Sequence, residues 1–355
     1  MVTPMPDPGF WQGKKVLLTG HTGFKGSWLM LWLENLKAEV FGMALPCETM
    51  PCLFDQLFPD GHPGHHIGDI RDSALVKQRI EQVQPDVILH LAAQPLVLRS
   101  YHHPLETWQT NVMGSAHILD AIKGCDRHIS VVMVTTDKVY ENREWVHAYR
   151  ETDRLGGHDP YSSSKAACEL LVDSYRKSFF ADAPVSIATA RAGNVIGGGD
   201  WADNRIVPDL VRAVARSDDL EVRNPEAMRP WQHVLDPLAG YLILAEKLWH
   251  DASLAEGFNF GPDVADQRSV CALVEAALTR WPGTWHDASD PAQPHEAGRL
   301  TLTTDKAQTR LRWRPRWSFD QAVAYTIDWY RATHEGASPR DLSLDQIAEF
   351  AKSDT

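Results

Sequence analysis

The sequence predicts an α/β fold built on a doubly wound parallel sheet, followed by a smaller, mixed C-terminal domain. Two patterns predict it. Short, continuously apolar runs alternate with segments of helical spacing over roughly the first half of the 355-residue chain, which is typical of parallel strands buried on both faces. A glycine-rich turn also follows the first apolar run and leads directly into a helical segment.

The expected elements can be placed in order along the chain. After about Arg191 the alternation ends, and the remainder is rich in Trp, Pro and His. We expect this part to close over the carboxyl edge of the sheet, where such folds bind ligands. The expected strands are 15–19, 39–44, 86–91, 130–135 and 185–190, and the expected helices are 27–36, 74–83, 111–122, 161–179, 206–215 and 237–249.

Gly20, Gly23 and Gly26 make a G-x-x-G-x-x-G turn that also contains Phe24 and Lys25. Residues without side chains let the chain turn tightly and let its backbone approach a diphosphate, which the helix N-terminus attracts. The turn predicts a Rossmann-type dinucleotide-binding domain; a purely structural loop is the alternative. The predicted domain spans 1–190 with 232–262 packing back on it, and the second domain spans 191–231 and 263–355.

The sequence leaves the choice between NAD and NADP open. The second strand runs Val40-Phe41-Gly42-Met43-Ala44-Leu45 and lacks the acid that usually holds the adenosine ribose. Lys25 could favour a 2′-phosphate. Asp69 is a candidate partner for the adenine amino group, and a turn or helix-capping aspartate is the alternative.

Tyr161 and Lys165 stand at i and i+4, on one face of an expected helix. A tyrosine has an ordinary pKa of about 10, which must fall by roughly 3 units, about 4 kcal/mol, before the phenol can act as a base near neutral pH. Lys165 and an oxidised nicotinamide ring are the two cations expected to stabilise the phenolate. The alternative is a chance pair on a surface helix.

Thr135-Thr136-Asp137-Lys138 follows a buried strand, so these side chains should emerge at the ligand edge. A threonine hydroxyl can bond the substrate hydroxyl, and Asp137 can act as an acid; a strand-end ion pair or helix cap is the alternative. We also expect at least one of Arg191, Arg205 and Arg229 to hold a diphosphate, because a guanidinium matches its geometry.

Composition excludes several functions. The net charge of −12 argues against nucleic acid binding. No apolar stretch reaches about 18 residues, so no membrane span is expected, and the short N-terminus lacks a signal core, so a cytoplasmic protein is expected. Five cysteines fit reduced thiols better than a disulfide framework. No metal site is expected, because Cys47 and Cys52 do not have tight ligand spacing with His62, His65 and His66.

These features together resemble the extended short-chain dehydrogenase/reductase superfamily, and within it the CDP-glucose 4,6-dehydratases. The resemblance covers nearly the whole chain, although dTDP-glucose dehydratases carry glutamate where this chain has Lys138. The stretches that carry it are Trp11 to Leu29 (WQGKKVLLTGHTGFKGSWL), His90 to Pro95 (HLAAQP), Thr135 to Asn142 (TTDKVYEN), Tyr161 to Lys165 (YSSSK), Arg191 to Trp201 (RAGNVIGGGDW) and Arg229 to Val234 (RPWQHV).

The resemblance implies a role for each of three groups of residues. The catalytic group comprises Thr136, Asp137, Lys138, Tyr161 and Lys165. The cofactor group adds Gly20, Gly23, Phe24, Lys25, Gly26, Asp69, Ile70, Leu91, Ala92 and Ala93 to Tyr161 and Lys165. The group that binds a nucleotide sugar in the second domain and the cleft comprises Gln94, Arg191, Asn194, Arg205, Arg229 and His233.

The resemblance also implies a hydro-lyase reaction on CDP-glucose. Tyr161 takes the proton of the 4-hydroxyl with help from Thr136, and a hydride passes from carbon 4 to the cofactor. A base then removes the carbon-5 proton, and Asp137 protonates the departing 6-hydroxyl. Lys138 is either that base or an electrostatic stabiliser of the enolate. Return of the hydride to carbon 6 leaves a 4-keto-6-deoxy sugar, and a cofactor recycled in place favours NAD over NADP.

The family further implies a homodimer or homotetramer and a role in deoxysugar supply for bacterial surface polysaccharide, including the O-antigen of lipopolysaccharide. Two other functions remain open from the residues alone. A nucleotide-sugar 4-epimerase would use Tyr161 and Lys165 without an acid for water loss. A non-catalytic dinucleotide sensor would need neither residue, and both are present.

Overall fold

A six-stranded parallel sheet forms the centre of the molecule. The structure is a computed structural model that describes residues 3–290 and 298–352, so small parts of the predicted second domain lie outside it. The strand order is β10-β5-β4-β3-β1-β2, which confirms the predicted doubly wound sheet. Its strands are β1 (Lys15–Thr19), β2 (Glu39–Met43), β3 (Val87–His90), β4 (Ile129–Val134), β5 (Val185–Ala192) and β10 (Gly257–Phe260).

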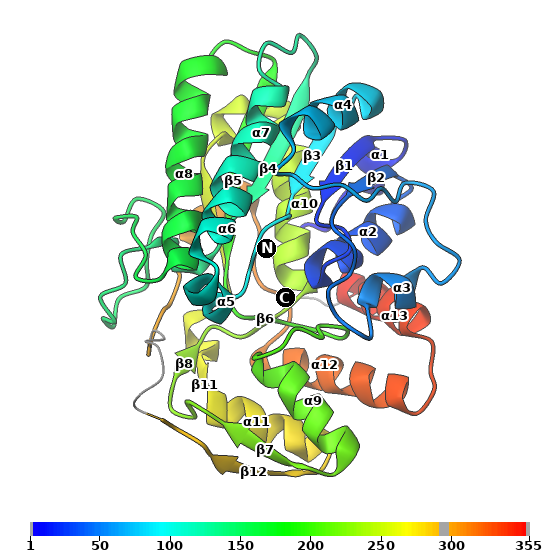
Figure 1. Cartoon of the computed structure of the whole chain (residues 1–355), viewed down its shortest axis with the longest axis vertical. Coiled ribbons are helices and arrows are strands. Elements are labelled where there is room, and N and C mark those ends of the chain that lie inside the picture. The colour runs from blue at the N-terminus through cyan, green and yellow to red at the C-terminus, as the bar shows by residue number, and fades with distance from the viewer. Residues whose placement is uncertain (1–2, 291–297, 353–355) are drawn as a thin grey trace.

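Alternate residues of the strands feed two separate cores. Val16 and Leu18 point to the face covered by α2 (Phe24–Asn35) and α10 (Leu235–His250). Leu17, between them, joins the core on the opposite face. Because nearly all strand residues are buried and helices cover both faces, no solvated face remains in the middle of the sheet (Figure 1). The helices of the second face are α4 (Ser73–Val83), α7 (Gly114–Ala121) and α8 (Pro160–Phe179).

After leaving the sheet at the end of β5, the chain returns to it through α10 and β10. α10 packs beside β4 and β5, and β10 then pairs in parallel with β5, with Phe258 opposite Ala190 and Phe260 opposite Ala192. β10, which is distant in sequence from the other strands, therefore forms one edge of the sheet.

The remaining chain forms a smaller lobe at the carboxyl edge of the sheet, seen in the lower part of Figure 1. Its short strands pair two by two, β7 with β12, β8 with β11 and β6 with β9. This lobe contains β6 (Val195–Ile196), α9 (Ile206–Arg216), β7 (Asp219–Val222), β8 (Met228–Arg229), β9 (Gln232–His233), β11 (Arg268–Ser269), α11 (Val270–Arg280), β12 (Thr284–Asp287), α12 (Phe319–His334) and α13 (Pro339–Lys352).

Short helices and turns lie in the connections between these elements and near the N-terminus. They are α1 (Pro8–Trp11), α3 (Leu53–Leu57), α5 (Val97–His102), α6 (Pro104–Trp108), the π-helical turns η1 (Gln109–Met113) and η5 (Ala307–Leu311), and the 3₁₀ turns η2 (Asp137–Val139), η3 (Ala252–Leu254) and η4 (Val264–Asp266). None of the helices in the described part of the chain combines the length and the apolar character needed to span a bilayer.

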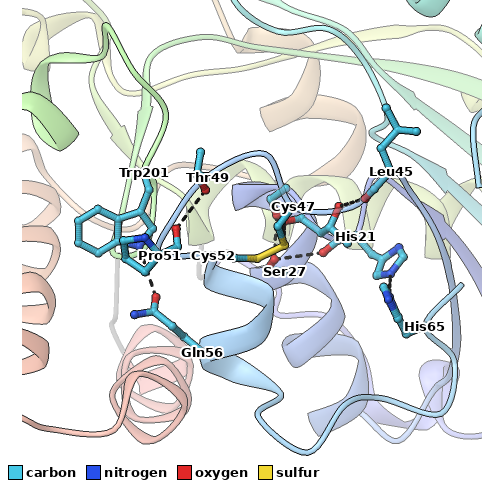
Figure 2. The surroundings of a disulfide bond; sticks show 12 residues. His21, Ser27, Leu45, Cys47, Thr49, Pro51, Cys52, Gln56, His65 and Trp201 are labelled. Atoms are coloured by element: carbon cyan, nitrogen blue, oxygen red, sulfur yellow. Dashed lines mark hydrogen bonds between the residues drawn. A yellow bond between two sulfur atoms is a disulfide. The ribbon is translucent and has the colours of Figure 1, made fainter. Parts of the chain in front are cut away.

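Two cysteines correct the expectation of reduced thiols. Cys47 and Cys52 form a disulfide in the loop between β2 and α3, whereas Cys125, Cys168 and Cys271 are free. The loop folds back on itself and brings the two Cα atoms to 6.0 Å, within the usual range for a disulfide. Figure 2 shows this bond beside the glycine turn, near His21 and Ser27. A five-residue separation in sequence did not reveal the reversal of the loop.

Candidate functional site

A cleft of about 1590 Å³ runs along the carboxyl ends of the strands, between the sheet and the smaller lobe. The glycine turn lines one end, the ends of β3 and β4 line the middle, and residues around β7 and α9 line the other end. The position agrees with the general rule for open α/β sheets, which bind ligands outside the carboxyl ends of their strands.

The glycine turn is packed so closely that side chains are excluded. Gly20 has a φ of +76°, and a Cβ atom there would lie 2.7 Å from the backbone nitrogen of Ala92. A Cβ atom on Gly26 would lie 2.1 Å from the carbonyl oxygen of Gly20. The backbones of the turn, of α2 and of the segment after β3 therefore touch. The first turn of α2, which begins after Gly23, faces the cleft, and this fits a diphosphate.

The neighbouring wall carries the predicted Asp69 together with charged groups that the sequence reasoning missed. Asp69 lines the cleft but forms an ion pair with Arg71 at 2.6 Å, which holds the pKa of Asp69 below its ordinary value. Arg99 of α5 contacts Glu48 at 2.9 Å and Glu106 at 3.0 Å. Glu48 follows the second strand after a loop, so a search for an acid at the strand end could not find it. Ile70, Leu91, Ala92 and Ala93 also line the cleft.

Tyr161 and Lys165, the predicted catalytic pair, line the cleft. Asp159 caps α8 by accepting a hydrogen bond from the Ser162 backbone N–H at 2.9 Å, so Tyr161 falls in the first turn and Lys165 one turn later. Both side chains are more than nine-tenths buried. The Lys165 ammonium donates to the Val134 carbonyl oxygen at 3.2 Å, which ties the helix to the end of β4.

Burial governs the acidity of this pair. It raises the pKa of Tyr161 to about 12, even though the Thr136 hydroxyl and the charge of Arg205 act in the opposite direction. Burial also lowers the pKa of Lys165. The protein's own groups therefore do not lower the phenol's pKa, because desolvation of the phenolate outweighs their favourable charges. The expected lowering depends on both cations, Lys165 and the oxidised nicotinamide ring.

Asp137 is buried beside Tyr161 and Lys165, and only one of its two carboxylate oxygens is hydrogen-bonded within the described residues. Its Oδ1 accepts a hydrogen bond from the Thr136 hydroxyl at 2.9 Å and lies 3.7 Å from the Lys138 ammonium. Its Oδ2 has no hydrogen-bond partner in the part of the chain that the structure describes. A Cβ atom on Gly193 would lie 1.9 Å from this oxygen, so the glycine makes the room that the carboxylate occupies. An unsatisfied buried carboxylate oxygen is a ready acceptor or proton carrier for a bound molecule.

Four of the six predicted substrate-binding residues line the cleft. Asn194 has a φ of +40°, and its buried Oδ1 has no partner among the described residues. Arg205 binds Asp200 at 2.8 Å, and Arg229 also reaches the cleft. Gln94 lines it too, but its amide is occupied by Leu96 and Thr107.

Arg191 and His233 correct the prediction, because neither lines the cleft. Arg191 is buried behind it and pairs with Glu169 at 2.7 Å. His233 is fully buried between the rings of Trp28 and Trp317, at centroid distances of 6.0 and 4.6 Å. Burial lowers the pKa of His233 to about 3, so this imidazole is neutral and apolar contacts hold it.

Comparison with known proteins shows extensive similarity. Residues 17–326 match the family described as GDP-mannose 4,6 dehydratase. The chain is 44% identical over 361 residues to a CDP-glucose 4,6-dehydratase of Salmonella typhimurium, covering 99% of this chain and 100% of that protein. It is 26% identical over 334 residues to a dTDP-glucose 4,6-dehydratase of Xanthomonas campestris, covering 88% of this chain and 92% of that protein.

Solved structures share the fold. DesIV, a dTDP-glucose 4,6-dehydratase of Streptomyces venezuelae solved with NAD and TYD bound, is 23% identical and has a TM-score of 0.77, covering 92% of this chain and 99% of that one. A UDP-glucose 4-epimerase of Thermus thermophilus, solved with NAD, is 21% identical and has a TM-score of 0.76, covering 89% of this chain and 98% of that one.

The raised pKa of Tyr161 predicts the ultraviolet titration of the ligand-free protein. At about pH 10 an ordinary tyrosine is half ionised, whereas Tyr161, with a pKa of about 12, should remain protonated. The phenolate absorbance of the wild type at that pH should therefore equal that of Tyr161→Phe, with a blocked tyrosine amide as the calibrant. An excess of half a phenolate in the wild type would contradict the burial argument.

Proposed function

This chain belongs to the GDP-mannose 4,6-dehydratase family, and we propose that it is a CDP-glucose 4,6-dehydratase that uses NAD. It converts CDP-glucose into CDP-4-keto-6-deoxyglucose by loss of water. One observation carries the reaction type, the convergence of Tyr161, Thr136 and the buried Asp137 on one cleft with the glycine turn. The similarity to the Salmonella CDP-glucose enzyme supports the choice of nucleotide sugar.

The residues around the glycine turn fit the cofactor. The exclusion of side chains at Gly20 and Gly26 lets backbone approach a diphosphate, and the first turn of α2 offers free N–H groups. Lys165 is in place to bond the nicotinamide ribose. When bound, the nicotinamide supplies an acceptor for the carbon-4 hydride and a donor of hydride to carbon 6. The second strand does not end in an acid that could hold the adenosine ribose. Recycling of the cofactor within the site favours NAD over NADP.

Tyr161 acts as the base for the 4-hydroxyl. Lowering a pKa from about 12 to about 7 requires roughly 5 units, or about 7 kcal/mol, of added stabilisation of the phenolate. Lys165 provides a cation on the same helix face, and the positive charge of the oxidised ring adds to it. The interaction with Thr136 already opposes the effect of burial on the pKa of Tyr161. The Thr136 hydroxyl would stabilise the phenolate by turning its proton from Asp137 to Tyr161.

Asp137 and Lys138 serve the loss of water. Once carbon 4 is a ketone, the proton on carbon 5 becomes acidic, because the resulting anion is delocalised. Asp137, with one buried oxygen free of partners among the described residues, is the group that gives a proton to the departing 6-hydroxyl. Lys138 lies 3.7 Å from that carboxylate and stabilises the enolate or removes the carbon-5 proton. Once carbon 6 has received the hydride, the base that took the carbon-5 proton returns it to carbon 5, which gives the 4-keto-6-deoxy sugar.

The far end of the cleft binds the nucleotide part. Arg205, Arg223 and Arg229 of the smaller lobe line the cleft, and Asn194 presents an amide oxygen without a partner in the described chain. A diphosphate held by arginine places the glucose over Tyr161. The product class, a 4-keto-6-deoxy sugar nucleotide, suits the supply of deoxysugars for surface polysaccharide.

The protein further forms a dimer through α6 and α8. These two helices pack together and carry several large apolar side chains that face solvent in the single chain. They are Leu105 (77% exposed), Leu170 (61%), Phe179 (48%) and Trp108 (39%). A concentration of such residues is typical of an interface between subunits.

The substrate proposal predicts a preference among nucleotide sugars. With NAD supplied, CDP-glucose should give a 4-keto product with a kcat/KM at least about 10-fold above those of dTDP-, UDP- and GDP-glucose. A site that hydrogen-bonds one base leaves some of its polar groups unpaired when another base is bound, and this weakens binding of the wrong nucleotide sugar. The product is followed by its absorbance in alkali. Absence of that product from CDP-glucose would sink the proposal, and equal turnover of all four would remove the nucleotide assignment.

Asp137→Asn should separate dehydration from oxidation. Loss of the acid should slow water loss by roughly 10²- to 10⁴-fold, while hydride transfer from carbon 4 persists, so the absorbance of reduced nicotinamide should accumulate on the enzyme. Asp173→Asn, a solvent-exposed acid paired with Lys177 on α8, is the matched control and should behave as wild type. A 4-epimerase would instead convert UDP-glucose equally well with either variant.

The dimer proposal predicts a dissociated variant. Leu105→Glu combined with Leu170→Glu places charges in the apolar surface, so the mass measured by sedimentation should fall from a multiple of the chain to that of one chain, because unpaired buried charge is costly. Melting of the secondary structure should be little changed. A wild type that sediments as a monomer at micromolar concentration would contradict the interface.

A further inference from the structure

A buried ion pair lies directly behind the catalytic centre. Glu169 belongs to α8, one turn beyond Lys165, and its side chain is 3% exposed. The Arg191 guanidinium of β5 contacts it at 2.7 Å and is 6% exposed. Neither group enters the cleft, and none of the steps above uses them. Removing two charges from water is costly, and a buried ion pair often adds little to the stability of the fold. We therefore expect this pair to have another role.

The carboxylate of Glu169 is fully engaged. Its Oε1 accepts a hydrogen bond from the Thr135 hydroxyl at 2.5 Å. Its Oε2 accepts from the Thr189 hydroxyl at 2.7 Å and from Arg191 at 2.7 Å. Burial alone would raise the pKa of Glu169, but Arg191 and the two hydroxyls together hold it below its ordinary value. The group is therefore a fixed anion that joins α8 to the ends of two adjacent strands.

Arg191 connects the ion pair to Tyr140, which follows Thr135 by five residues. Its Nη1 donates to the Tyr140 hydroxyl at 2.8 Å and to the Glu151 carbonyl oxygen at 3.2 Å. The Tyr140 hydroxyl in turn donates to Asn259 Oδ1 at 2.7 Å, on β10. The pair thus holds residue 135 through Glu169 and residue 140 through Arg191.

These two attachment points enclose the catalytic loop. Thr136, Asp137 and Lys138 lie between Thr135 and Tyr140, and η2 forms within the same stretch. Tyr161 and Lys165 lie on the helix that carries Glu169. The ion pair therefore connects the two halves of the proposed catalytic machinery without touching a reacting atom.

We propose that Glu169 and Arg191 are positioning residues for the dehydration reaction, which set the distance between the Thr136–Lys138 loop and the Tyr161–Lys165 pair by holding both ends of the loop to α8. The inference rests on the proposed function. Its physical basis is the sensitivity of proton and hydride transfer to placement, since a displacement of about 1 Å costs on the order of 10²-fold in rate.

Two threonines provide a matched test. Thr135→Val and Thr189→Val each remove one buried hydroxyl from the same carboxylate and leave the ion pair in place. Only Thr135 adjoins the catalytic loop. Thr135→Val should lower kcat by roughly 10-fold or more with KM within about 2- to 3-fold of wild type, because an interaction that matters only in the transition state is lost. Thr189→Val should keep both constants within about 2-fold of wild type.

Two further variants complete the experiment. Tyr140→Phe removes the second attachment and should reproduce the kcat loss of Thr135→Val. Glu169→Gln removes the anion itself and should lose at least as much kcat, while Arg191 is left without its counter-charge. Melting temperatures are measured for all four, and the two threonine variants should show similar decreases. The split between kcat and KM distinguishes positioning from general loss of stability.

The outcomes are distinct. Thr135→Val and Tyr140→Phe retaining as much kcat as Thr189→Val would overturn the inference, as would kcat values that merely follow the melting temperature across the series. The wild type is assayed in parallel on CDP-, dTDP-, UDP- and GDP-glucose. If the wild type dehydrates none of them, the proposed function fails, and with it the reaction that the pair was proposed to serve. If the wild type is active and the variants are not impaired, only the positioning role fails.

Discussion

Removing a phenol and an ammonium from water is the constraint on which the site depends. Tyr161 and Lys165 are both buried, and burial disfavours the charged form of each. In the proposed mechanism, the phenolate forms when the positive charge of an oxidised dinucleotide enters the cleft. Binding of the cofactor and activation of the proposed base are then coupled by electrostatics. Without the cofactor, the raised pKa keeps Tyr161 protonated at neutral pH.

Cations from both lobes gather around the same centre. Burial and the charge of Arg205 lower the pKa of Lys25 to about 7, and Lys165 contributes in the same direction. Asp137 and Asp200 offset only part of this repulsion. An anionic ligand that spans the cleft relieves it, so the site is arranged for molecules that carry diphosphates. The net charge of the whole chain, −12, does not reveal that Lys25, Lys165 and Arg205 lie close together.

The parts of the fold and site that sequence could predict are those determined by residue type and spacing. Apolar runs identified five of the six strands of the sheet, and the spacing of Tyr161 and Lys165 placed both on one helix face. On a strand that is buried on both faces, the sequence does not alternate between polar and apolar residues, so it does not show to which face a side chain points. Arg191 therefore seemed a ligand for phosphate, although it points to Glu169 behind the sheet. His233 was misplaced for a similar reason, because its tryptophan neighbours come from distant segments. The capping box formed by Ser318 and Gln321 marked the start of α12 and was overlooked.

The return of the chain to the sheet has a consequence for synthesis. β5 leaves the ribosome with its outer side unpaired, and its partner β10 follows only after the 64 residues from 193 to 256 have emerged. During that interval the backbone groups along β5 are open to pairing with another chain, and the smaller lobe begins to fold before the larger one is finished. A nascent chain that stops before residue 257 exposes the unpaired edge of β5. A delay in translation between residues 193 and 256 therefore favours aggregation.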